Sequence, residues 1–120
     1  MKRVGVTGAS GFIGRALVAA LARRGDMVRA LVRDPKASAF PSGVEARQLD
    51  LMREPDAVAV KAFEGLDAVV HLAGESVAGR WTSEKKKKIH ESRQLTTRHL
   101  VAAMRASSQP PRTLVSASAS

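Results

Sequence analysis

The stretch TGASGFIG, residues 7–14, decides the fold of this chain. It joins KRVGVT (2–7), which predicts a buried strand, to GFIGRALVAALARRG (11–25), which predicts a helix. Gly25 is typical of the residue that ends such a helix. The apolar residues of the helix recur at three- and four-residue spacing, and they are Ile13, Leu17, Ala20 and Leu21. A strand that passes through a glycine-rich turn into an amphipathic helix is typical of a parallel α/β sheet.

Three glycines in this stretch, Gly8, Gly11 and Gly14, are spaced by three residues. Gly8 allows a tight turn off the strand, Gly11 lets the backbone approach a pyrophosphate, and Gly14 lets the helix pack closely on the sheet. The N–H groups at the helix start, together with the helix dipole, then bind phosphate oxygens. The spacing differs by one residue from G-x-G-x-x-G, and no Gly-Lys-Ser/Thr follows, so the stretch is not a P-loop. The alternative is a glycine turn with a structural role only.

The rest of the chain continues the alternation of strands and helices. Two further helices are predicted at 54–65, with Pro55 in the first turn, and at 82–107. The other strands are predicted at 27–33, 44–50, 66–74 and 112–118. The fold class is therefore α/β, a Rossmann-like doubly wound parallel sheet in three layers, incomplete at its carboxyl-terminal side. Residues 1–120 form one domain of five strands.

Composition limits the classes of protein and of site. The 120 residues include no cysteine, which excludes disulfides and thiolate metal sites and favours a reducing, cytoplasmic location. His71, His90 and His99 do not have the spacing of metal ligands, so we predict no metal site. His71 is expected to be a packed residue, and the other two to lie on a solvated helix face. No apolar run is long enough for a membrane span.

The formal net charge of +9 and a pI of about 11.1 raise the alternative of nucleic-acid binding. The basic residues are spread along the chain, except for Lys85 to Lys88. Aromatic residues, which would stack on bases, make up only 3%. We therefore predict no specific nucleic-acid partner, and we retain a basic nucleic-acid-binding domain as an alternative function.

The end of the second strand is where a dinucleotide's adenine ribose would lie. An acidic residue there binds the 2′-hydroxyl of NAD, whereas an arginine favours the 2′-phosphate of NADP. The sequence offers both, Arg33 followed by Asp34, with Lys36 nearby. Asp34 precedes Pro35 and is equally typical of a turn. These residues favour NADP, with NAD as the alternative.

Four blocks of sequence, TGASGFIG, LDAVVHLAGE, the long helix and LVSAS, carry a family resemblance. Together they resemble the extended short-chain dehydrogenase/reductases, the NAD(P)-dependent epimerase/dehydratase group, in its amino-terminal portion only. The stretch HLAGESVAGRWTSEKKKKIHESRQLTTRHL is similar to a bacterial epimerase-like branch whose relatives include sugar-nucleotide epimerases. The resemblance implies hydride transfer between an alcohol or its ketone and a nicotinamide.

The resemblance also implies a role for individual residues. Along the pyrophosphate it places Gly8, Ser10, Gly11, Phe12 and Ile13. At the adenosine it places Arg33, with Asp50 and Leu51 bordering the adenine; beside the nicotinamide ribose it places Leu72, Ala73 and Gly74. Asp50 is equally typical of a local cap, and Leu72 and Ala73 of core residues. Ser118 matches the family's catalytic Ser/Thr.

The family's general acid/base is a tyrosine, with a lysine four residues on. This chain contains no tyrosine, and it also lacks the remaining strands and the substrate-binding part that the resemblance implies. We therefore expect the cofactor-binding part of a longer enzyme acting on a small molecule such as a sugar nucleotide, inactive alone, with a homodimer as its expected assembly. Whether the chain is itself an enzyme stays open, and a non-catalytic NADP(H)-binding module is the alternative.

Overall fold

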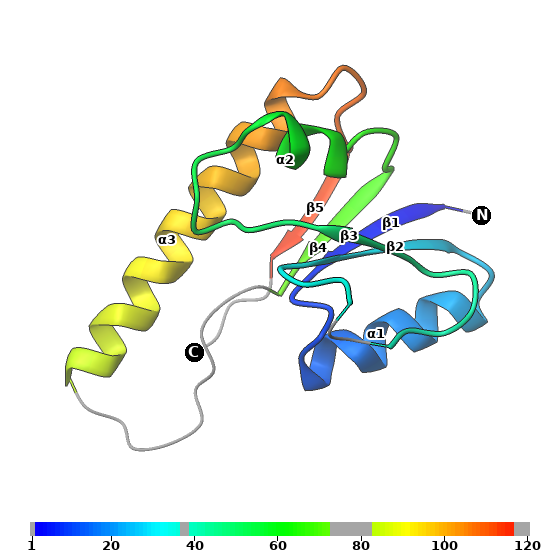
Figure 1. The fold of residues 1–120 in the computed structure, drawn as a ribbon, viewed down its shortest axis with the longest axis horizontal. Helices are drawn as coiled ribbons and strands as arrows, with labels where there is room; N and C mark the ends of the chain where they lie inside the picture. Colours follow the sequence, from blue (N-terminus) through cyan, green and yellow to red (C-terminus); the bar gives the residue numbers. More distant parts are fainter. Residues whose placement is uncertain (1, 37–38, 73–82, 117–120) are drawn as a thin grey trace.

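The computed structural model describes residues 2–36, 39–72 and 83–116. It contains a five-stranded parallel sheet and three helices (Figure 1). In chain order the elements are β1 (Arg3–Thr7), α1 (Phe12–Arg23), β2 (Met27–Val32), β3 (Glu45–Gln48), α2 (Ala57–Ala62), β4 (Ala68–His71), α3 (Ser83–Ala106) and β5 (Thr113–Ser116). The predicted Rossmann-like α/β class is confirmed.

The strand order is β3-β2-β1-β4-β5, and every neighbouring pair is parallel. The chain therefore moves outward from β1 to β3, then returns through α2 to the other side of β1. The strand order reverses between β1 and β4, and such a switch point is where open α/β sheets bind ligands, outside the carboxyl ends of the strands. Because all strands are parallel, their carboxyl ends share one edge, which includes Thr7 and His71, paired in register.

Helices cover both faces of the sheet, as predicted: α1 lies on one face, and α2 and α3 lie on the other (Figure 1). Alternate residues of each strand point to opposite faces, so the sheet contributes to two cores. The core under α1 is built from Val4, Val6, Ala9, Val18, Val28, Ala30 and Val32. The core under α2 and α3 is built mainly from larger residues, which include Leu31, Leu49, Phe63, Leu66, Val69 and Leu100.

The helix α1 packs through a different set of residues from the predicted one. Gly14 and Val18 are its buried residues, whereas Ile13 is 69% exposed and Ala20 is also exposed. Leu17 and Leu21 pack against the core as expected. The prediction was wrong for Ile13 because the first turn of the helix follows the glycine turn at the sheet edge, where this face meets solvent.

The helix α2 is shorter than the predicted range 54–65. Its N-cap is Asp56, whose Oδ1 accepts a hydrogen bond from the Ala59 backbone N–H at 3.0 Å. Pro55 therefore precedes the cap instead of occupying the first turn. An aspartate that satisfies an N–H group of the first turn is a strong helix start, and it outweighs the preference of proline for that turn.

The strand β5 forms an exposed edge of the sheet. All of its residues are exposed, including Leu114 at 36% and Val115 at 54%. In register, Leu114 pairs with Val69 and Val115 pairs with Val70, so the two apolar side chains point to opposite faces. An uncovered apolar edge strand is a template for pairing with another strand.

Glu64, which follows α2, forms hydrogen bonds with Ser108, which follows α3. Its carboxylate accepts hydrogen bonds from the Ser108 backbone N–H at 2.7 Å and from the Ser108 hydroxyl at 2.8 Å. These bonds favour the charged carboxylate and lower the pKa of Glu64 from its usual 4.5. The resulting stability is complete above pH 4.5 and is lost as the pH falls through the lowered pKa.

We expect Glu64→Gln to lower the melting temperature at pH 7 and to lower it less at pH 3, because the charged carboxylate that accepts the Ser108 hydrogen bonds is lost as the pH falls through its lowered pKa. Thermal unfolding followed by circular dichroism at the two pH values measures this. Glu54→Gln is the matched control, because Glu54 is an exposed carboxylate on the loop before α2. A deficit of the Glu64 variant that is equal at both pH values would contradict a contribution from the charge.

Within the three described ranges, no helix is both long and apolar enough to cross a membrane.

Candidate functional site

The glycine turn begins directly at the end of β1. Gly8 has a φ of +65°, a backbone conformation that side-chain-bearing residues rarely adopt, so the predicted need for glycine here is confirmed. The turn is closed by a hydrogen bond from the Gly11 N–H to the Gly8 carbonyl at 3.1 Å. The helix begins at once, since the Arg15 N–H donates to the Gly11 carbonyl at 2.9 Å.

Gly14 is required by the turn itself. A Cβ at this position would overlap the Gly8 carbonyl oxygen and lie 2.8 Å from the Ala9 Cα. The sequence predicts close packing between the helix and the sheet, whereas the close contact in the structure is between the helix and the glycine turn. The absence of a side chain at Gly14 therefore lets α1 begin immediately above the end of β1.

Gly11 differs from the other two glycines. Its φ of −75° and ψ of 172° are open to any residue, and an added Cβ would be 3.4 Å from the Gly8 carbonyl oxygen, an ordinary contact. Nothing within the described protein therefore demands a glycine at this position. A molecule seated on the turn would supply the missing reason, because a side chain here would project into its place.

The amino terminus of α1 is open to an anion. Gly11 is the N-cap residue and supplies no side-chain hydrogen bond, and the first turn holds no acidic residue. The first N–H groups of a helix need acceptors, and the helix dipole favours negative charge there. Ser10 is exposed, and Phe12 and Ile13 are 92% and 69% exposed, so these residues border an open surface instead of a core.

Two charged residues follow β2. Asp34 accepts a hydrogen bond from the Lys36 backbone N–H through its Oδ1 at 3.0 Å, which is the geometry of a local turn. Arg33 is exposed, and none of the described carboxylates forms an ion pair with it. The turn alternative for Asp34 therefore has structural support, and Arg33 is an exposed residue at the carboxyl edge.

The loop after β3 holds Asp50 and Leu51. The Oδ1 of Asp50 accepts the Met52 backbone N–H at 3.0 Å, and Leu51 is buried in the core under α3. The Leu51 carbonyl accepts a hydrogen bond from the Nδ1 of His99 at 2.6 Å. Since a carbonyl only accepts, the Nδ1 of His99 carries a proton. The helix α3 therefore holds the backbone of this loop in place.

The role of His99 differs from the sequence prediction, which places it on a solvated face. Thr96, Leu100 and Ala103 are buried, so one side of α3 follows the i, i+4, i+7 pattern, and His99 borders that side. The sequence contains this periodicity, but the basic residues along the helix, such as Arg98, make the face of His99 look solvated.

The end of β4 is joined to the end of β1 through side chains. The Nδ1 of His71 lies 2.8 Å from the hydroxyl oxygen of Thr7, and that oxygen accepts the Leu72 backbone N–H at 2.9 Å. His71 is 4% exposed, and its burial lowers its pKa from the usual 6.5, which keeps the ring neutral at pH 7. The prediction of a packed histidine is confirmed.

Three predicted site residues, Ala73, Gly74 and Ser118, lie outside the described residues.

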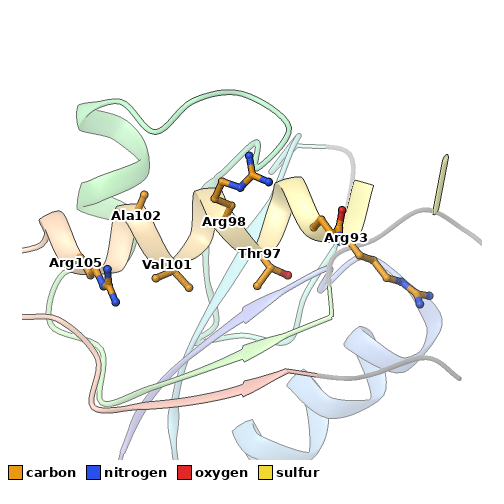
Figure 2. A pocket seen from close by; sticks show the side chains of 7 residues that line it. Arg93, Thr97, Arg98, Val101, Ala102 and Arg105 are labelled. Carbon is orange, nitrogen blue, oxygen red and sulfur yellow. The ribbon is translucent and has the colours of Figure 1, made fainter. Parts of the chain in front are cut away.

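A shallow groove of about 760 Å³ runs along α3 (Figure 2). It is lined by Arg93, Gln94, Thr97, Arg98, Val101, Ala102 and Arg105. The helix lies on the face of the sheet opposite α1, so the groove is separate from the glycine turn. Thr97 links this groove to the candidate site, because its hydroxyl lies 3.4 Å from the Nε2 of His71. No group of three or more His, Asp or Glu in the described ranges could hold a metal ion.

Comparison with known proteins agrees with this geometry. The model of the NAD dependent epimerase/dehydratase family matches residues 4–120. The epimerase family protein YfhF of Bacillus subtilis is 30% identical over 116 residues, which cover 97% of this chain and 37% of the relative. Human epimerase family protein SDR39U1 is 34% identical over 116 residues, covering 94% of this chain and 35% of the relative.

Solved structures give the same result. Human SDR39U1 (isoform 2) with NADPH has a TM-score of 0.69 and 33% identity, and the match covers 95% of this chain and 35% of that one. A tyrosine-to-alanine mutant of uronate dehydrogenase from Agrobacterium tumefaciens, complexed with NAD, has a TM-score of 0.71 and 33% identity, over 99% and 41% of the two chains. The chain thus spans little more than a third of the length of these relatives. With its sheet order, its glycine turn and a family match over nearly all of its residues, the chain belongs to the NAD dependent epimerase/dehydratase family.

Proposed function

We propose that residues 1–120 are the NAD(P)-binding domain of an epimerase, dehydratase or dehydrogenase that transfers hydride to and from a nicotinamide. The observation that carries this proposal is Gly11, a glycine for which the described residues around it show no structural need. It stands at a helix start without a side-chain cap, beside the switch point of the sheet. The pyrophosphate would lie along the backbone of residues 8–13, with its charge facing the amino terminus of α1.

The proposed cofactor is NADP(H) in preference to NAD(H). Asp34 is engaged in its own turn, whereas Arg33 is exposed at the end of β2. An arginine at this position binds a 2′-phosphate through charge-assisted hydrogen bonds. Human SDR39U1 with NADPH, among the matching structures, supports this preference. We propose that the backbone near Asp50 and Leu51, held by His99, borders the adenine.

We expect Arg33→Ala to weaken NADPH binding selectively. The variant loses hydrogen bonds to a phosphate that NADH does not have, so the selective loss should be about 1.5–3 kcal/mol, which is roughly 10- to 150-fold in Kd. Isothermal titration with each cofactor measures the two affinities.

The matched control is Arg23→Ala. Arg23 is an exposed arginine in the last turn of α1, and so this variant removes the same charge far from the carboxyl edge. The Arg23→Ala variant should bind NADPH and NADH with unchanged affinities. Equal losses for NADPH and NADH in Arg33→Ala would instead return the ribose-binding role to Asp34.

The proposed substrate is a sugar or a sugar nucleotide with an alcohol that is oxidised to a ketone or lactone. Two relatives support this class. One is uronate dehydrogenase, and the other is L-arabinose 1-dehydrogenase of Haloferax volcanii, which is 42% identical over 73 residues. The protein would orient the cofactor's reactive carbon against the substrate, while the cofactor supplies the hydride chemistry. Ser118 is proposed to orient the substrate hydroxyl.

A non-catalytic NADP(H)-binding module is the second candidate, because the chain contains no tyrosine. Assembly as a homodimer stays a prediction, and the exposed edge of β5 is the feature that favours self-association. The absence of a specific nucleic-acid partner also stays a prediction. Binding to an oligonucleotide would fall steeply as salt is raised, whereas binding of a dinucleotide would fall less.

A further inference from the structure

His71 connects three parts of the fold through one buried ring. It is the last residue of β4 and is 4% exposed. Its Nδ1 lies 2.8 Å from the hydroxyl oxygen of Thr7, and its Nε2 lies 3.4 Å from the hydroxyl oxygen of Thr97 on α3. Both nitrogens of the ring therefore face a hydroxyl partner, which a residue needed only for packing volume would not require.

The contact with Thr7 reaches the glycine turn. Thr7 is the last residue of β1 and the residue before Gly8, where the chain turns with a φ of +65°. A threonine held through its hydroxyl has a fixed side-chain rotamer, and a fixed rotamer restrains the backbone next to it. His71 therefore restrains the point at which the turn leaves the sheet.

The same hydroxyl also holds the strand on the other side of the switch point. The Leu72 backbone N–H donates to the Thr7 oxygen at 2.9 Å. Leu72 directly follows β4, so this hydrogen bond ties the backbone at the end of β4 to the end of β1. The hydrogen-bonded cluster of His71, Thr7 and the Leu72 amide, which we name the switch-point cluster, thus fixes the ends of β1 and β4 relative to each other.

We propose that His71 is a positioning residue of the dinucleotide site, which holds the start of the glycine turn and the backbone at Leu72 at the separation that the cofactor requires. This inference rests on the proposed function. In this proposal His71 does not contact the cofactor. The ring acts through Thr7 on Gly8 on one side of the switch point, and through Thr7 on Leu72 on the other.

The test uses His71→Leu, which keeps an apolar side chain of similar volume, and His71→Asn, which restores a group able to hydrogen-bond to Thr7. We expect about tenfold weaker NADPH binding in the leucine variant, the size of one hydrogen bond, and recovery to within about threefold in the asparagine variant. Thr7→Val should lose a similar amount, and adding it to His71→Leu should cause little further loss, because the two residues act as one unit.

Val69→Ala is the matched control, since Val69 is fully buried on the same face of β4, two residues before His71. It should lower the melting temperature without changing the affinity for NADPH. Hydrogen exchange without cofactor gives a second readout. In His71→Leu the Leu72 amide should exchange about tenfold faster while the Val70 amide keeps its rate. In Val69→Ala the two amides should change together.

A folded His71→Leu variant with unchanged Leu72 exchange would overturn the inference. So would an affinity loss that His71→Asn does not recover, or one that Val69→Ala reproduces. If the unsubstituted chain fails to bind NADPH, the proposed function fails. In that case the exchange of the Leu72 amide alone decides whether His71 holds the switch-point cluster in place.

Discussion

Replacing Gly11 with valine should abolish dinucleotide binding and leave the fold intact. The backbone at this position is open to any residue, and a Cβ would make only an ordinary 3.4 Å contact with the Gly8 carbonyl oxygen. Valine is a poorer N-cap residue than glycine, which costs at most about 1–2 kcal/mol of stability. The valine side chain would, however, stand where the pyrophosphate must approach the backbone. We expect Kd for NADPH to rise at least about 100-fold, or ~2.7 kcal/mol.

Substitutions at two other glycines serve as controls, because they show whether any loss of glycine has the same effect. Gly43 has a φ of +91° with nothing within 4 Å of an added Cβ, so Gly43→Ala should strain the loop and cost stability without changing affinity. Gly14→Ala should damage both stability and affinity, because its Cβ would lie 2.8 Å from the Ala9 Cα. A folded Gly11→Val chain that binds NADPH normally would exclude the glycine turn as the pyrophosphate site.

The 120-residue chain should show no dehydrogenase or epimerase turnover, even when it binds cofactor. Oxidation of an alcohol requires removal of the hydroxyl proton as hydride leaves, and a positioned base accelerates this step by about 10²–10⁴-fold. The family resemblance assigns that step to a tyrosine, and the chain has none. Among the described residues, His71 is buried at the end of β4, and His99 is half-buried with its Nδ1 donating to the Leu51 carbonyl.

Turnover is measured as NADPH absorbance with NADP⁺ and a panel of sugars, uronates and sugar nucleotides. The control is the same assay with Ser118→Ala. Turnover by the unsubstituted chain that disappears in the serine variant would mean that these residues carry their own catalytic machinery. The proposal of a cofactor-binding part that is inactive alone would then be wrong.

Much of this structure could be predicted from the sequence because its signals are local. The spacing of Gly8, Gly11 and Gly14 between a strand and a helix predicts the β-α-β start, and the alternation of strands and helices predicts a parallel sheet. The positive φ of Gly8 follows directly from residue chemistry, and so does the termination of α1 shortly before Gly25, whose φ is +91°.

The features that could not be predicted depend on contacts between distant segments. The hydrogen bond from His99 to Leu51 spans 48 residues, and the one between His71 and Thr7 spans 64. Neither leaves a mark in local periodicity. The partner of Gly14 also differs from expectation, because the sequence indicates that a side chain would be too large there but not which atoms it would meet.

Titration of the unsubstituted chain with NADPH and NADH tests the central claim most directly. We predict saturable binding of one dinucleotide per chain, tighter for NADPH, with only a modest decrease in affinity between low and high salt. An oligonucleotide titrated under the same conditions should bind weakly and lose its binding as salt is raised. No saturable binding of either dinucleotide to the folded chain would contradict the proposal that residues 1–120 form an NAD(P)-binding domain.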